Sequence, residues 1–138
     1  MPYRFPRRSQ YSTRVKRTAA GLGLVAEEAI PKDAFIIEYF GEILSNDDAD
    51  EKGGKYLFEV DGGYTIDGTT RRNRARYINH SCKPNCETEV AGRRVFVYAK
   101  RSIAEDEELS YDYGKEYFDT HIKPFGCRCG HHRRNRAA

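Results

Sequence analysis

Residues 77–86 place three chemically versatile side chains within four positions, at Asn79, His80 and Cys82. An amide both donates and accepts hydrogen bonds, an imidazole titrates near neutral pH, and a thiol can bind metal. Burying such groups costs free energy unless each finds a partner. A lone histidine is more often a satisfied core residue, but the flanking asparagine and cysteine put a functional interpretation on an equal footing.

A second segment, residues 108–114, carries two phenols at Tyr111 and Tyr113. Side chains two positions apart on a strand point to the same face, so the sequence predicts that these two rings lie together. Tyrosines at strand ends usually serve packing, but two adjacent phenols are unusual for packing alone. The two segments together therefore indicate one site.

The four cysteines of the chain are Cys82, Cys86, Cys127 and Cys129. Cys127 and Cys129 are poorly placed to bridge each other, and intracellular proteins rarely contain disulfides. Metal ligands or reduced thiols are the remaining alternatives. No run of residues approaches the roughly 18 apolar positions of a membrane span, and the basic N-terminus lacks the apolar core of a signal peptide. We therefore expect an intracellular protein.

Charge is arranged in blocks along the chain of 138 residues, although the net charge is only +3. Residues 1–18 carry six Lys or Arg and no acid, and residues 71–101 carry nine against two acids. Residues 27–61 carry eleven acids against three Lys, and residues 105–119 carry seven against one Lys. The pattern indicates one basic and one acidic face, with solvated loop charge as the simpler alternative.

Short β-branched and aromatic runs predict a single domain made of strands with little helix. We expect strands over residues 34–40, 56–60, 64–67, 95–99 and 109–113, and short helices over residues 47–52 and 115–120. The turn residues Asp61-Gly62-Gly63 predict a hairpin between the second and third of these strands. The fold class is mostly β, a β-rich α+β domain of several small sheets.

Gly21 and Gly23 flank Leu22 just before an apolar strand. Two glycines near a turn most often supply positive φ angles. The segment lacks the third glycine and the helix of a dinucleotide-binding fold, so that function is not indicated.

Taken in order, these segments resemble the SET domain, the protein-lysine methyltransferase fold. The matching segments are residues 21–23, 39–42, 56–58, 66–67, 76–82, 84–86 and 108–114. The resemblance implies several small curved sheets with a C-terminal pseudoknot, and an enzyme that uses S-adenosylmethionine. On this basis we divide the chain into a basic arm (1–13), a SET domain (14–114) and a tail resembling a post-SET segment (115–138).

The resemblance also assigns roles to individual residues. The backbone of four residues would cradle the cofactor: Ala20, Gly21, Leu22 and Gly23. Its amino-acid and adenine parts would be held by Tyr56, Arg76, Asn79 and His80, with Tyr117 as a further contact. Tyr113 would be the catalytic tyrosine, and the lysine channel would be lined by Tyr39, Tyr111 and Phe58. In this family a tyrosine at the position of Tyr111 accompanies mono- or dimethylation, which is the product we expect.

Family members with a C-terminal extension bind zinc through the cysteine at the position of Cys82 and a Cys-x-Cys-x4-Cys run. Cys82, Cys127 and Cys129 match three of these ligands, but Arg134 stands at the fourth position and cannot ligate. A tetrahedral site with one histidine is chemically sound. The candidates for the fourth ligand are His131, His132 and Cys86. Reduced thiols without metal are the alternative.

The acidic blocks favour a basic protein substrate, a histone tail or histone-like protein. The sequence leaves open a non-histone substrate, such as a ribosomal or host protein, and a catalytically silent domain that binds peptide or nucleic acid. Basic runs at residues 1–18, 71–76 and 133–136 keep nucleic-acid contact open as a secondary property. The short segment between Gly41 and Tyr56 implies a substrate groove that a second copy in a homodimer could complete. The expected location is the nucleus of a eukaryote, or otherwise the cytoplasm or a host cell.

Overall fold

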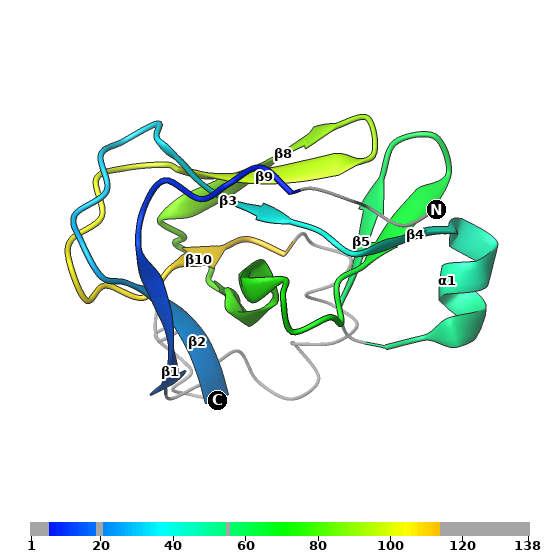
Figure 1. Cartoon of the computed structure of the whole chain (residues 1–138), viewed down its shortest axis with the longest axis horizontal. Helices are drawn as coiled ribbons and strands as arrows, with labels where there is room; N and C mark the ends of the chain where they lie inside the picture. Colours follow the sequence, from blue (N-terminus) through cyan, green and yellow to red (C-terminus); the bar gives the residue numbers. More distant parts are fainter. Residues whose placement is uncertain (1–5, 19–20, 55, 114–138) are drawn as a thin grey trace.

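The computed structural model describes residues 6–18, 21–54 and 56–113. These residues form ten short strands, one α-helix and one 3-10 helix (Figure 1). In chain order they are β1 (Thr13–Thr18), β2 (Gly21–Ala26), β3 (Phe35–Tyr39), β4 (Glu42–Ser45), α1 (Asn46–Lys52), β5 (Leu57–Val60), β6 (Tyr64–Asp67), η1 (Arg74–Tyr77), β7 (Asn79–His80), β8 (Cys86–Ala91), β9 (Arg94–Ala99) and β10 (Ser110–Tyr111).

The strands are distributed over four small sheets rather than one large one. Two three-stranded sheets have the orders β3-β9-β8 and β4-β6-β5, and both are antiparallel. A two-stranded antiparallel ribbon joins β1 to β2. β7 and β10 pair in parallel, although they lie far apart in the sequence. The predicted fold class, a mostly β domain of several small sheets, is confirmed.

Most of the predicted elements lie where their sequence signals place them. β3, β5, β6 and β9 fall on four expected strands, and the turn after Val60 closes the β5–β6 hairpin with Gly62 and Gly63 at positive φ. The expected strand over residues 109–113 is shorter, because only Ser110–Tyr111 pairs, with β7. The helical turn expected over residues 115–120 lies outside the described residues.

The helix α1 has the polar signals that start and stop a short helix. The side chain of Ser45 accepts a hydrogen bond from the Asp48 backbone N–H, and two acids lie in the first turn. Lys52 lies in the last turn, where the helix dipole favours a cation. Within the described ranges, no helix has the length and apolar character needed to cross a membrane.

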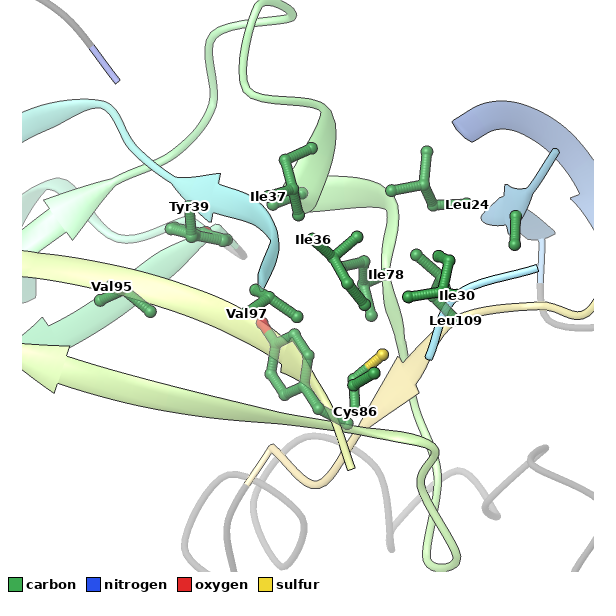
Figure 2. Close-up of a cluster of buried hydrophobic side chains, with 14 of the residues drawn as sticks. Leu24, Ile30, Ile36, Ile37, Tyr39, Ile78, Cys86, Val95, Val97 and Leu109 are labelled. Carbon is green, nitrogen blue, oxygen red and sulfur yellow. The ribbon is translucent and has the colours of Figure 1, made fainter. Parts of the chain in front are cut away.

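The core lies where the small sheets meet, and each sheet contributes apolar side chains to it (Figure 2). Leu24 from β2, Ile36 from β3 and Val97 from β9 are fully buried. Ile78 and Leu109 join them from the two segments that carry the polar motifs. Burial of each large apolar side chain contributes about 1.5–3 kcal/mol. The motifs are therefore anchored by the same core that stabilises the sheets.

A buried carboxylate links α1 to the β4-β6-β5 sheet. Asp67 forms an ion pair with Lys52 and accepts hydrogen bonds from the Thr69 backbone N–H at 3.0 Å and hydroxyl at 2.5 Å. Burial raises the pKa of Asp67, but the bonds from Lys52 and Thr69 and the lysine charge outweigh it. The pKa therefore lies below its ordinary value of 3.8. A carboxyl whose pKa is lowered by folding stabilises the fold above its ordinary pKa and loses that contribution as pH falls through the lowered value.

We expect Asp67→Asn to reduce the free energy of unfolding at pH 7 by about 1 kcal/mol, since Lys52 is half-exposed and its charge is screened. The difference from the parent protein should shrink as pH falls from the ordinary pKa of aspartate toward the lowered pKa of Asp67 in the folded parent. Urea unfolding at pH 7 and pH 3 measures both values. Asp61→Asn, at an exposed turn position, is the control. A difference that is the same at both pH values would contradict the ion-pair explanation.

Candidate active site

The two polar motifs meet in the parallel pairing of β7 with β10. Asn79 lies opposite Ser110, and His80 lies opposite Tyr111. The Ser81 backbone N–H continues the ladder by donating to the Tyr111 carbonyl at 3.2 Å. One site thus forms from segments about 30 residues apart, as the residue types of the two motifs predict.

Five rings from four parts of the fold form a continuous row, which we call the aromatic row: Tyr39, Phe58, Tyr111, Tyr113 and His80. The ring centroids of Tyr39 and Phe58 lie 5.3 Å apart, and those of Phe58 and Tyr111 lie 6.3 Å apart. Tyr111 and Tyr113 are separated by 5.1 Å, and Tyr113 and His80 by 5.4 Å. The prediction that the phenols of Tyr111 and Tyr113 lie together is confirmed.

Backbone carbonyls hold two of the phenol groups in this row. The Tyr39 hydroxyl donates to the Tyr56 carbonyl at 2.7 Å, and the Tyr113 hydroxyl donates to the Ile78 carbonyl. A phenol whose proton is committed in this way presents oxygen lone pairs to its other neighbours. Tyr113 is thereby suited to accept from, or stabilise, a cationic group.

His80 is oriented by the backbone of the facing motif. Its Nδ1 accepts a hydrogen bond from the Tyr113 backbone N–H at 3.1 Å. In the neutral imidazole this fixes the proton on Nε2, which lies 3.4 Å from the Cys82 thiol. The imidazole therefore links the exposed thiol to the segment that carries Tyr113.

Arg76 lies beside Tyr56, as expected for two residues of one binding site. Its guanidinium is 4.6 Å from the Tyr56 ring centroid and 4.8 Å from that of Tyr77. One guanidinium N–H donates to the Thr69 carbonyl. Among the buried side-chain nitrogen and oxygen atoms of the described residues, only Arg76 Nε has no hydrogen-bond partner. A buried cationic donor that lacks an acceptor suits an anionic ligand such as a carboxylate.

Gly21 and Gly23 differ in what they require of the backbone. Gly21 has a φ of 103° and open space around it, so it supplies the positive φ that the sequence predicts. Gly23 has no such angle. A Cβ at Gly23 would lie 2.6 Å from Glu108 Oε2 and 3.1 Å from Asn79 Nδ2, so a larger residue here would displace these side chains.

Sequence reasoning gave no role to Asn85, a buried residue that joins the two motifs. Its Nδ2 donates to the Glu108 carbonyl at 2.8 Å and to Glu107 Oε2 at 3.2 Å. Its Oδ1 accepts from the Ser110 backbone N–H at 2.9 Å. The signal available in the sequence was an asparagine after proline within a polar motif, but its partners lie far along the chain.

The cysteines separate into an exposed and a buried thiol. Cys86 is 1% exposed and points into the apolar core (Figure 2). Burial raises the pKa of this thiol to about 12. A thiol in this apolar environment favours its protonated form, and Cys86 faces the core whereas Cys82 is exposed.

The predicted metal ligands are only partly within the described residues. Cys82 is exposed there, and no group of three His, Cys, Asp or Glu side chains in that part of the chain could hold a metal ion. Several predicted site residues lie outside the described ranges: Ala20, Tyr117, Cys127, Cys129, His131 and His132.

The fold and site together define a class, a mostly β domain of small sheets with a tyrosine-rich site where two paired motifs meet. The family model described as the SET domain matches residues 21–114. The chain belongs to the SET-domain family, whose methyltransferases use S-adenosylmethionine.

The chain is similar to several proteins named histone-lysine N-methyltransferases. It is 42% identical to ATXR7 of Arabidopsis thaliana over 78% of this chain and 8% of that protein. It is 40% identical to ASHR3 of the same plant over 84% of this chain and 25% of that protein. It is 40% identical to trr of Drosophila melanogaster over 80% of this chain and 5% of that protein. The chain thus spans a small part of the length of these relatives.

Proposed function

We propose that this chain transfers methyl groups from S-adenosylmethionine to the side-chain amine of a lysine in a histone tail. The observation that carries the proposal is the aromatic row, in which Tyr113 meets the paired motifs at one end and Tyr39 lies at the other. The names of the relatives support the substrate class, and several are described as specific for lysine 4 of histone H3.

The chemistry demands a neutral amine held in line with the methyl donor. Free lysine has a pKa of about 10.4, so at neutral pH it is almost entirely protonated and has no lone pair for attack. A channel of Tyr39, Phe58 and Tyr111 would strip water from the ammonium and lower that pKa, and the proton would pass to bulk water. No strong base is then required, and alignment provides most of the rate.

When bound, S-adenosylmethionine supplies an electrophilic methyl group on a sulfonium cation. Arg76 Nε, with no acceptor in the described part of the chain, would receive an anionic group of this ligand. Tyr56, Asn79 and His80, with the backbone of residues 20–23, would hold the remainder, and Tyr117 is retained as a contact from the sequence. Tyr113 presents oxygen lone pairs beside the aromatic row and acts by orientation and electrostatics, because a phenol with a pKa of about 10 is a poor base.

The proposal is tested by incubating the protein with labelled S-adenosylmethionine and, in separate reactions, core histones, a histone H3 peptide that contains lysine 4, and a total lysate. We expect the parent protein to label a histone and the Tyr113→Phe variant to leave it unlabelled. Label only on other proteins of a total lysate would favour the second candidate, a methyltransferase for a non-histone substrate. No label on any protein would favour a catalytically silent peptide-binding domain.

Tyr111 is expected to limit the product to mono- or dimethyl-lysine. Its ring lies 6.3 Å from Phe58 and 5.1 Å from Tyr113, between the channel and the catalytic tyrosine. The phenol oxygen occupies space and can hold the amine or a water, which hinders a methylated nitrogen from rotating into line. Tyr111→Phe should therefore add one methyl group to the main product, as read by mass spectrometry of a methylated peptide. Abundant trimethyl-lysine from the parent protein would contradict this role.

Zinc is proposed to bind Cys82, Cys127 and Cys129, with His131 or His132 completing the set. The donor types suit a tetrahedral zinc site, and Cys82 is exposed and accessible to further ligands. We expect close to one zinc per chain when the protein is purified without a histidine tag, and Cys82→Ser should lower that ratio. Metal analysis with a ratio near zero for the parent protein would end this proposal.

Two partner predictions remain secondary to the proposed reaction. Arg71, Arg72 and Arg74 are exposed and could contact nucleic acid, which salt-dependent DNA binding tests. A homodimer that completes the substrate groove is tested by the molar mass in solution. A histone substrate places the protein in the nucleus.

A further inference from the structure

We propose that Glu108 is a positioning residue that fixes the side-chain amide of Asn79, so that Asn79 Oδ1 is presented as an acceptor to the ammonium group of the methyl donor. This inference rests on the proposed function, because it concerns the binding of S-adenosylmethionine. Glu108 precedes β10 and lies at the junction of that strand with β7 and β2, where it bridges to Val25.

Both N–H groups of the Asn79 amide are directed at oxygen atoms. Asn79 Nδ2 lies 2.9 Å from Glu108 Oε2 and 3.1 Å from the Leu22 carbonyl oxygen. A carbonyl oxygen and an ionised carboxylate can only accept hydrogen bonds. These two partners therefore determine which end of the amide is nitrogen.

The alternative amide orientation is strongly disfavoured. A rotation of 180° would place Asn79 Oδ1 against the Leu22 carbonyl and the Glu108 carboxylate, where three oxygens would face one another without a proton. It would also leave both partners without their donor. The carboxylate contributes most to this preference, since hydrogen bonds to an ionised acceptor are about twice as strong as neutral ones.

Gly23 on β2 lies close to this pair of side chains. A Cβ there would lie 2.6 Å from Glu108 Oε2, 2.8 Å from a methyl carbon of Thr18 and 3.1 Å from Asn79 Nδ2. No positive φ explains the glycine, because Gly23 is absent from the residues with that angle. The glycine therefore lets β2 approach the Glu108–Asn79 pair closely enough for the Leu22 carbonyl to accept from Asn79.

The fixed orientation of the Asn79 amide favours a ligand group that is cationic and donates a hydrogen bond. With both N–H groups occupied, Asn79 can offer a ligand only its oxygen, and the neighbouring carboxylate adds negative charge and polarises the amide. An ammonium gains more from this environment than a neutral amino group on an adenine ring. The amino-acid part of the methyl donor carries such an ammonium.

Calorimetry with two nucleosides separates a specific effect of Glu108 on the ammonium group from a general effect on nucleoside binding. S-adenosylhomocysteine carries the amino-acid part, whereas 5′-methylthioadenosine contains the adenosine without it. We expect Glu108→Ala to weaken S-adenosylhomocysteine binding about tenfold, and Glu108→Gln to weaken it a few-fold. Binding of 5′-methylthioadenosine should stay within about twofold for both variants. Glu105→Gln, an exposed acid nearby in the sequence, is the matched control and should change neither affinity.

A pair of substitutions tests the orientation directly. Asn79→Asp sets two carboxylates against each other and should weaken S-adenosylhomocysteine binding more than Glu108→Ala does. Glu108→Gln added to Asn79→Asp restores a donor–acceptor pair and should recover part of the lost affinity. Unfolding temperatures of all variants show whether each remains folded. Recovery of S-adenosylhomocysteine affinity without an equal recovery of 5′-methylthioadenosine affinity discriminates, because a merely structural lesion would affect both nucleosides alike.

The outcomes separate this inference from the proposed function. If the Glu108 variants bind S-adenosylhomocysteine as tightly as the parent protein does, the positioning role is overturned and the proposed function is not. Equal losses for both nucleosides would also overturn it, because the effect would not depend on the ammonium. Parent protein that binds neither nucleoside would overturn the proposed function and this inference with it.

Discussion

Tyr113→Phe is expected to lower the methyl-transfer rate by about 100-fold or more while the protein keeps its fold. The hydroxyl of Tyr113 donates to the Ile78 carbonyl, and its ring contacts Tyr111 and His80. Removing the hydroxyl keeps the ring contacts but deletes the oxygen whose lone pairs, under the proposed function, would stabilise the cationic centre. The effect should fall on kcat rather than on the affinity for the peptide, because that oxygen acts most strongly where charge redistributes during transfer.

A tyrosine outside the site provides the comparison for this variant. Tyr98 on β9 packs against Phe35 at 5.8 Å between ring centroids, and its hydroxyl plays no part in the aromatic row. Tyr98→Phe should keep the parent rate within about twofold. Initial rates with labelled S-adenosylmethionine and a histone peptide measure both variants. A Tyr113→Phe protein that retains more than half of the parent rate would remove Tyr113 from the catalytic machinery.

The strands that the sequence predicts are those with dense apolar content. β3 is buried at all five positions, and its β-branched and aromatic residues identify it without any tertiary information. β1 and β8 were not predicted, because Thr13–Thr18 is mostly polar and Cys86–Ala91 alternates with polar residues. Such strands exist because a neighbour pairs with them, and single-strand composition does not contain that information.

The aromatic part of the site could be predicted from the sequence, whereas the hydrogen-bond partners of its polar part could not. The rings of Tyr111 and Tyr113 lie together as their spacing in the sequence predicts, although only Tyr111 belongs to β10 and Tyr113 follows the strand. The partners of Asn85 and Asn79 are about 20 to 60 residues away and become neighbours only when β2, β7 and β10 assemble. The roles of Glu108 and Asn85 therefore depend on tertiary structure that no local pattern encodes.

Asn85→Ala is expected to reduce the free energy of unfolding by about 3–5 kcal/mol. Asn85 is 2% exposed, and its side chain satisfies the Ser110 backbone N–H and the Glu108 carbonyl. Alanine lacks the amide, so the Ser110 N–H and the Glu108 carbonyl would stay buried without this hydrogen-bond partner. Each such loss costs about 1–3 kcal/mol. The loss is a large part of the roughly 5–15 kcal/mol that stabilises a typical domain.

Urea unfolding measures this effect, and an unchanged slope would show that the denatured state is the same. Asn46→Ala is the matched control. Asn46 also bonds through both ends of its amide, to Glu59 and Thr65, but at a half-buried position where water can replace the partners. Its cost should be about 1 kcal/mol. If Asn85→Ala and Asn46→Ala reduce the free energy of unfolding equally, burial of Asn85 does not increase the cost of losing its hydrogen bonds.

Asn85→Asp distinguishes the loss of the donor from the loss of the acceptor. Aspartate keeps an oxygen for the Ser110 N–H, but it places a second oxygen where Nδ2 lies, 3.2 Å from Glu107 Oε2 and 2.8 Å from the Glu108 carbonyl. In the parent protein, burial raises the pKa of Glu107, but bonds from Arg101, Ala104 and Asn85 outweigh it, so the pKa lies below its ordinary value. In the variant, burial of the new carboxyl and repulsion from the nearby Glu107 raise the pKa of the introduced aspartate above its unfolded value, while Arg101 still pairs with Glu107. A group whose pKa is raised by folding loses stability as pH rises through it, so this variant should be less stable at pH 7 than at pH 5 relative to the parent protein. A stability difference that does not change between these pH values would show that repulsion at Glu107 is not the cause.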